Sequence, residues 1–154
     1  MPKQTFLNLP ESKRRAIIDI AIDEFAAHNY RSASISRIVA RAGIAKGSVY
    51  QYFEDKRDLF MYLLDLAVAE KMAALQQKPP RPGMDFFSYL RWMAEAGGRA
   101  TLANPRLAQV AYRAYFGELA FHDEVVGQMK EASLRYVEGL VRQAIVRGDI
   151  DPAV

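Results

Sequence analysis

A cluster of polar side chains within residues 46–53 has the chemistry needed to bond to DNA. Its expected outward-facing members are Lys46, Gly47, Ser48, Tyr50, Gln51 and Tyr52. An ammonium, hydroxyls and an amide bond to phosphate oxygens and to base edges in a duplex. A glycine among them lets the backbone approach the duplex closely. We therefore predict that this segment enters the major groove.

Two short helices joined by a glycine turn are predicted to position these side chains. Ser34 is a suitable N-cap for a helix over residues 35–41. Gly43 follows where a left-handed residue commonly ends a helix. A second helix is predicted over residues 46–53. Residues 34–53 together therefore have the pattern of a helix-turn-helix.

The same pattern separates core residues from surface residues. Val49 and Phe53 stand four residues apart, so we assign both to the core and give neither a role in DNA binding. A preceding helix is predicted over residues 10–28, with Ile17 and Phe25 on its apolar stripe. We expect that stripe to pack across the helix pair.

Positive charge is concentrated at the same end of the chain. Residues 1–60 contain ten Lys or Arg against seven Asp or Glu, whereas residues 61–154 contain eleven of each. All of the net charge of +3 therefore lies in the first sixty residues. A local basic surface suits a polyanion, although a solvated charged surface has the same composition.

Several other classes of protein are not expected. The chain has no cysteine, which excludes disulfides and thiolate metal sites. No apolar run is long enough for a membrane span, and the N-terminus does not resemble a signal peptide, so we expect a cytoplasmic protein. His28 and His122 have no neighbouring ligand set, and no nucleophile stands beside a base. We expect no metal, no cofactor and no enzymatic activity.

Four segments in register resemble the DNA-binding domain of TetR-family transcriptional repressors. They are Phe25–Tyr30, Ser34–Gly43, Ile44–Phe53 and Lys56–Phe60. The resemblance extends over about residues 11–64, and beyond them it concerns the architecture alone.

The resemblance implies a set of DNA contacts. At the start of the first helix of the pair it implies phosphate contacts from Ser34, Ser36 and Arg37. From the second helix it implies base and phosphate contacts by Ala45, Lys46, Gly47, Ser48, Tyr50, Gln51 and Tyr52. The resemblance also implies that Lys56 contacts a backbone phosphate. Its replacement by alanine would then lower affinity for all sequences and reduce the slope of log affinity against log salt by about one.

Two positions depart from the family pattern. Ala45 stands where a serine cap is common, and Gln51 stands where an aromatic residue is frequent. A glutamine amide can bond to adenine in the major groove, so Gln51 is a candidate for base recognition.

We predict an all-α protein in which a long helix joins two domains. The three-helix, homeodomain-like DNA-binding domain is expected over residues 1–55 and a helical effector-binding and dimerisation domain over residues 56–154. Residues 78–83 hold three prolines and a glycine and cannot continue a helix. The helices expected after the first three cover residues 56–76, 84–101, 105–116 and 123–147.

Aromatic residues in the second domain suggest an effector pocket. The candidate lining residues are Tyr62, Trp92, Tyr112, Tyr115, Phe116 and Met129. A largely apolar pocket would suit a small apolar or amphipathic molecule. Ordinary core packing explains the same residues, and the sequence leaves this alternative open.

Together these features predict a sequence-specific transcriptional regulator, most simply a ligand-responsive repressor that binds a palindromic operator as a homodimer. The alternative is a helical small-molecule-binding protein or enzyme whose N-terminal three-helix unit is only structural. Salt-dependent binding to duplex DNA distinguishes the two.

The second domain is expected to look truncated. In the family, two further helices usually follow the segment that resembles residues 148–152, and they form the dimer interface. We therefore expect the last helix to have an incompletely covered apolar face. Its residues are Val126, Met129, Leu134, Val137, Leu140 and Val141.

Overall fold

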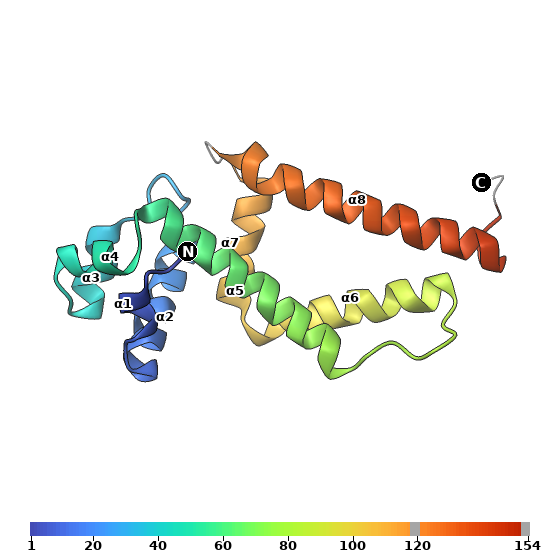
Figure 1. Ribbon diagram of the computed structural model, residues 1–154, viewed down its shortest axis with the longest axis horizontal. Helices are drawn as coiled ribbons and strands as arrows, with labels where there is room; N and C mark the ends of the chain where they lie inside the picture. Colours follow the sequence, from blue (N-terminus) through green and yellow to red (C-terminus); the bar gives the residue numbers. More distant parts are fainter. Residues whose placement is uncertain (118–120, 152–154) are drawn as a thin grey trace. The chain divides into compact units, whose positions relative to one another are not determined.

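The computed structural model describes residues 1–117 and 121–151, apart from several side chains near the start of the last helix. All regular structure in these ranges is helical (Figure 1). The helices are α1 (Gln4–Leu7), α2 (Glu11–Ala27), α3 (Ile35–Ala42), α4 (Lys46–Tyr52), α5 (Lys56–Gln77), α6 (Phe86–Ala103), α7 (Pro105–Phe116) and α8 (His122–Arg147). Seven of them match the predicted helices within a few residues, which confirms the all-α fold. The short helix α1 was not predicted.

The helices divide into two compact units. The first unit contains Met1–Glu70 and α7, and the second contains Lys71–Ala103 and α8. Packing therefore assigns the first part of α5 to the unit that holds the helix-turn-helix. The sequence placed the domain boundary after residue 55 according to function, and that division remains a prediction.

The core of the first unit is built from one face of each helix. Ile17 and Phe25 of α2 are buried, as are Val49 at the centre of α4 and Phe53 at its end. This confirms their assignment to the core. Ile38 of α3 is fully buried as well. Burying such side chains contributes about 1.5–3 kcal/mol each, which explains why short helices are held in place here.

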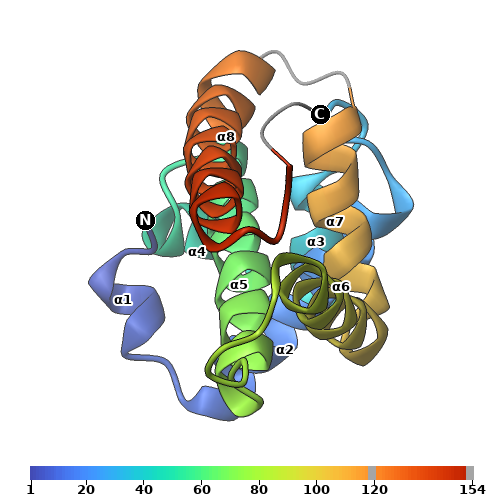
Figure 2. The ribbon, with the colours of Figure 1, turned by 90° about the vertical axis from the view of Figure 1, so that its right-hand side faces the viewer.

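Helix α7 belongs to the first unit because it packs along α2. Views from two sides show α2, α7 and the beginning of α5 next to one another (Figures 1 and 2). Asp23 of α2 accepts hydrogen bonds from Arg41 of α3, at 2.7 Å, and from Arg106 of α7. One carboxylate thus links the helix-turn-helix to α7.

In the second unit, α6 and α8 converge where α6 begins and α8 ends (Figure 1). The Phe86 N–H donates to the Asp149 carboxylate at 3.1 Å, and the Arg147 guanidinium donates to the Met84 carbonyl. Gly148 ends α8 in the left-handed region with a φ of 79°. These contacts join the two helices at this end.

The apolar face of α8 is covered only in part. Leu134 and Val137 are exposed, as expected, with 63% and 47% of their surface accessible. Leu140 and Val141 are half-buried. Val126 is buried, so its inclusion in the uncovered face was wrong. The side chain of Met129 lies outside the described residues.

Candidate nucleic-acid interface

Helix α4 presents a polar face and an apolar face. Lys46, Gly47, Tyr50 and Gln51 are exposed, and Ser48 is half-buried. These residues keep the outward orientation that the sequence predicts. The exposed face therefore carries an ammonium, a phenol and an amide on one short helix.

Tyr52 corrects the predicted orientation of one residue. It was expected to point outward, but only 8% of its surface is exposed, and its ring centroid lies 5.7 Å from that of Phe6. The reason is helical periodicity, because Tyr52 follows Val49 by three residues and precedes Phe53 by one. Positions 49, 52 and 53 therefore share the inward face of α4.

Ser34 and Gly43 define the ends of α3 as the sequence predicts. The Ser34 hydroxyl accepts a hydrogen bond from the Arg37 backbone N–H at 3.4 Å. Gly43 has a φ of 64°, in the left-handed region that favours glycine. Ser36 is exposed on the first turn of α3. At the start of α4, by contrast, the exposed Ala45 provides no side-chain cap.

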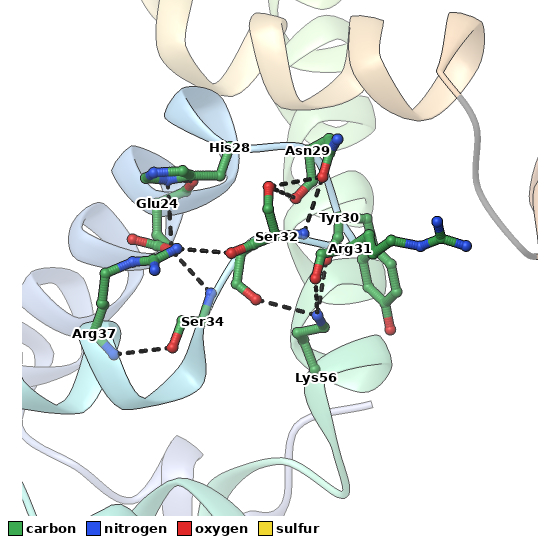
Figure 3. A network of polar contacts seen from close by, with 10 residues as sticks. Glu24, His28, Asn29, Tyr30, Arg31, Ser32, Ser34, Arg37 and Lys56 are labelled. Carbon is green, nitrogen blue, oxygen red and sulfur yellow. Dashed lines mark hydrogen bonds and ion pairs between the residues drawn. The ribbon is translucent and has the colours of Figure 1, made fainter.

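A buried carboxylate organises the chain between α2 and α3 (Figure 3). Glu24 has 3% of its surface exposed. It accepts hydrogen bonds from the Ser34 backbone N–H at 2.8 Å and from the Arg37 guanidinium, whose Nε lies 2.9 Å away. Arg37 also donates to the Ser32 carbonyl at 2.7 Å. The arginine expected to touch phosphate is therefore engaged in fixing this loop.

Lys56 holds the same loop from the opposite side (Figure 3). Its ammonium donates to the carbonyls of Tyr30, Arg31 and Ala33 at 2.8, 3.3 and 3.1 Å. It also lies 4.7 Å from the centroid of the Tyr30 ring. An ammonium has three N–H donors, and these contacts use all of them. In this arrangement Lys56 orients the loop between α2 and α3.

The pKa of Glu24 reflects this network. Burial raises it, but the hydrogen bonds from Arg37 and from the Ser34 N–H, together with the charges of Arg37 and His28, outweigh burial. The net result is a pKa below the ordinary value of 4.5. A carboxylate with a lowered pKa stabilises the fold above that value and loses its contribution as the pH falls through the folded-state pKa.

We therefore expect the Glu24→Gln variant to lose about 1.5–3 kcal/mol of stability at neutral pH, because hydrogen bonds to a charged acceptor are lost. As the pH falls from the ordinary value of 4.5 through the lowered folded-state pKa, the difference from the wild type should shrink, because Glu24 becomes protonated first in the unfolded chain and then in the folded one. Denaturant unfolding across this pH range measures both effects. The exposed Glu95 provides the matched control as Glu95→Gln. A constant difference at all pH values would contradict the assigned role.

The N-terminal segment contacts the end of α4, which sequence reasoning missed. Lys3 donates from its ammonium to the Tyr50 carbonyl at 2.9 Å and from its backbone N–H to the Tyr52 carbonyl at 2.8 Å. The Thr5 hydroxyl donates to the Gln51 carbonyl. The only sequence signal for this segment is an isolated Phe6, which is fully buried.

The candidate pocket residues are dispersed in the structure. Tyr62 is half-buried and borders a groove of about 270 Å³ between α2, α5 and α7, which none of the other candidates lines. Trp92 is half-buried in the second unit and donates from its indole N–H to the Lys78 carbonyl at 2.6 Å. Tyr112, Tyr115 and Phe116 are exposed on α7. The side chain of Met129 is outside the described part of the chain.

The described residues lack two features that other classes of function require. Within the described residues, no group of three or more His, Cys, Asp or Glu side chains is arranged to hold a metal ion. Over the same residues, no helix combines the length and apolar character that crossing a membrane requires.

Comparison with known proteins agrees with the geometry of the helix-turn-helix. Residues 17–63 match the model of the bacterial regulatory proteins of the tetR family. A crystal structure of a TetR family transcriptional regulator from Chloroflexus aurantiacus is 46% identical in sequence, with a TM-score of 0.84. The match covers 98% of this chain and 71% of that one.

More distant relatives extend the comparison. The HTH-type transcriptional regulator AcrR of Shigella flexneri is 30% identical over 121 residues, which cover 77% of this chain. The match spans about half of that relative's length, 53%. The regulator FadR of Bacillus subtilis, solved in complex with stearoyl-CoA, has a TM-score of 0.70 at 18% identity, covering 91% of this chain and 75% of that one. These relatives are regulators, so the alternative of an enzyme with a merely structural N-terminal unit is not favoured.

Proposed function

This chain belongs to the TetR family of bacterial regulatory proteins, and from that premise we propose that it binds operator DNA and regulates transcription, most simply as a repressor. The observation that carries the proposal is the exposed polar face of α4, where Lys46, Gly47, Tyr50 and Gln51 stand opposite a fully packed apolar face. Hydrogen-bonding groups on such a helix suit the edges of base pairs in the major groove.

Some of the other candidate residues contact DNA directly, and the rest hold the contacting residues in position. Ser34, Ser36 and Ser48 contribute hydroxyls, and Ala45 contributes the backbone at the start of α4, for contacts with phosphate. Arg37 and Lys56 act differently, by fixing the loop between α2 and α3. The buried Tyr52 supports α4 from within.

The functional unit is a homodimer with an effector site. Two-fold symmetry places two recognition helices in successive major grooves, about 34 Å apart. The exposed Leu134 and Val137 of α8 offer apolar surface to a second copy. The effector is a small apolar or amphipathic molecule that binds among the helices after α4. It binds more tightly to the dimer at one spacing of the two α4 helices, and this difference in affinity shifts the population of dimers that can bind DNA in the cytoplasm. The complex of FadR with stearoyl-CoA supports this class of ligand.

The test is the salt dependence of binding to a duplex selected from a random pool. Lys46 is exposed and makes no ion pair or hydrogen bond through its ammonium within the described residues, whereas the ammonium of Lys56 donates to three carbonyls. We expect Lys46→Met to reduce the slope of log affinity against log salt by about 0.9, the value for one phosphate contact. Lys56→Met should weaken binding with an unchanged slope.

The two lysine variants are matched controls for each other. The same change in side chain is made ten positions apart, on a contact residue and on a support residue. An unchanged slope for Lys46→Met would contradict the placement of α4 on DNA. Failure of the selection to yield any preferred duplex would contradict the proposed function itself.

A further inference from the structure

The backbone carbonyls at the C-terminal end of α4 accept hydrogen bonds from a segment that lies far from it in the sequence. The last carbonyls of a helix have no partner within that helix. Here the carbonyls of Tyr50, Gln51 and Tyr52 accept hydrogen bonds from Lys3 Nζ, from the Thr5 hydroxyl and from the Lys3 backbone N–H. Three consecutive carbonyls of the recognition helix are thus held by residues 3–5.

Residues 3–5 are fixed in place by the buried Phe6 that follows them. Phe6 has none of its surface exposed, and its ring centroid lies 4.8 Å from that of Phe53 and 5.9 Å from that of Tyr62. The Lys3 ammonium is also paired with Glu54 at 2.7 Å. The segment is therefore fixed to the core and to the chain just after α4.

A seven-residue helix needs such support. Helices this short are unstable in isolation, because few hydrogen bonds offset the entropy of ordering them. Val49 anchors the middle of α4 in the core, whereas Tyr50 and Gln51 stand on its last turn with exposed side chains. Recognition of base edges depends on the orientation of that turn.

We propose that residues Lys3–Leu7 form a clamp that positions the last turn of the recognition helix and thereby contributes to sequence discrimination without touching DNA. The inference rests on the proposed function, and it concerns positioning residues rather than contacts. Because the Lys3 ammonium is already engaged by a carbonyl and a carboxylate, its removal should not change the number of phosphates that the protein neutralises.

The experiment compares two changes at Thr5. Thr5→Val removes the hydroxyl donor and keeps the branched shape, whereas Thr5→Ser keeps the hydroxyl. The double variant Lys3→Met with Thr5→Val removes both side-chain donors and leaves Phe6 in place. For each protein, the affinity for the selected operator and for a scrambled duplex is measured at several salt concentrations, at a temperature where circular dichroism shows a folded chain.

We expect the ratio of operator to scrambled affinity to fall roughly tenfold in the double variant, the size of effect that loss of one or two hydrogen bonds produces. Thr5→Val should show part of this loss, and Thr5→Ser should retain the wild-type ratio. The salt slope should stay unchanged in all three. A merely stabilising segment would lower the melting temperature and leave the ratio unaltered.

Two results would overturn the inference while leaving the proposed function intact. One is a wild-type affinity ratio in the folded Thr5→Val and double variants. The other is a salt slope reduced by about 0.9 in the double variant, which would make Lys3 a direct phosphate contact. If the wild-type protein itself lacked preference for any duplex, the proposed function would fail, and the clamp with it. Should the double variant not fold, the single Thr5 variants decide the question.

Discussion

The Phe6→Ala variant should lose about 3–5 kcal/mol of stability, the usual cost of removing a buried aromatic ring. Phe6 has no exposed surface and lies against the rings of Tyr52, Phe53 and Tyr62. Alanine would leave a cavity beneath α4 that the surrounding rings cannot close without shifting. The variant should also release residues 3–5 from the end of α4, so that unfolding of the first unit begins there.

Denaturant unfolding followed by circular dichroism measures this loss. Leu7→Ala is the matched control, because Leu7 is the next residue of α1 and 45% of its surface is exposed. We expect the control to change stability by less than about 1 kcal/mol, as is usual for surface substitutions. If the two variants were equally stable, the N-terminal segment would not be part of the core.

The helix-turn-helix is predictable from sequence because its signals are local. Ser34 caps α3, Gly43 ends it, and Val49 and Phe53 repeat at helical spacing, so each feature is visible within a few residues. The inward position of Tyr52 follows from the same period. Residue type alone does not decide its position, because a tyrosine hydroxyl suits a DNA contact while its ring suits the core.

The N-terminal segment is not predictable in this way. A helix of four residues has too few positions to show a periodic pattern, and Pro10 is itself a sufficient start signal for α2. Lys3 and Thr5 bond to carbonyls that are 46 or more positions away. Nothing in the local sequence indicates partners at that separation.

The intramolecular partners of Arg37 and Lys56 are not predictable for a related reason. Both were expected to bind phosphate because they are basic and stand near the start of a helix. In the structure their donors meet a buried carboxylate and backbone carbonyls of one loop. Carbonyls belong to every residue type, so no sequence pattern shows which of them a lysine or arginine will find. Charge alone therefore does not distinguish a basic residue that contacts phosphate from one that fixes a loop.

The Gln51→Ala variant should bind the selected operator about 5- to 150-fold more weakly, which corresponds to about 1–3 kcal/mol for loss of one specific base contact. The fold should not suffer, because the Gln51 side chain is exposed and the hydrogen bond from Thr5 reaches its backbone carbonyl, which alanine retains. Affinity for scrambled DNA and the salt slope should stay the same, since the amide carries no charge.

Pairing this variant with operator substitutions identifies the base pair that Gln51 reads. Each base pair of one half-site is changed in turn, and the affinities of wild-type and Gln51→Ala protein are compared in double-mutant cycles. At the base pair that Gln51 contacts, the substitution should weaken the wild type and leave the variant unaffected. At all other base pairs the two proteins should respond alike. Gln76→Ala, which changes an exposed glutamine near the far end of α5, should behave as wild type throughout. Equal responses of Gln51→Ala and wild type at every base pair would exclude Gln51 from base recognition and assign specificity to the other exposed residues of α4.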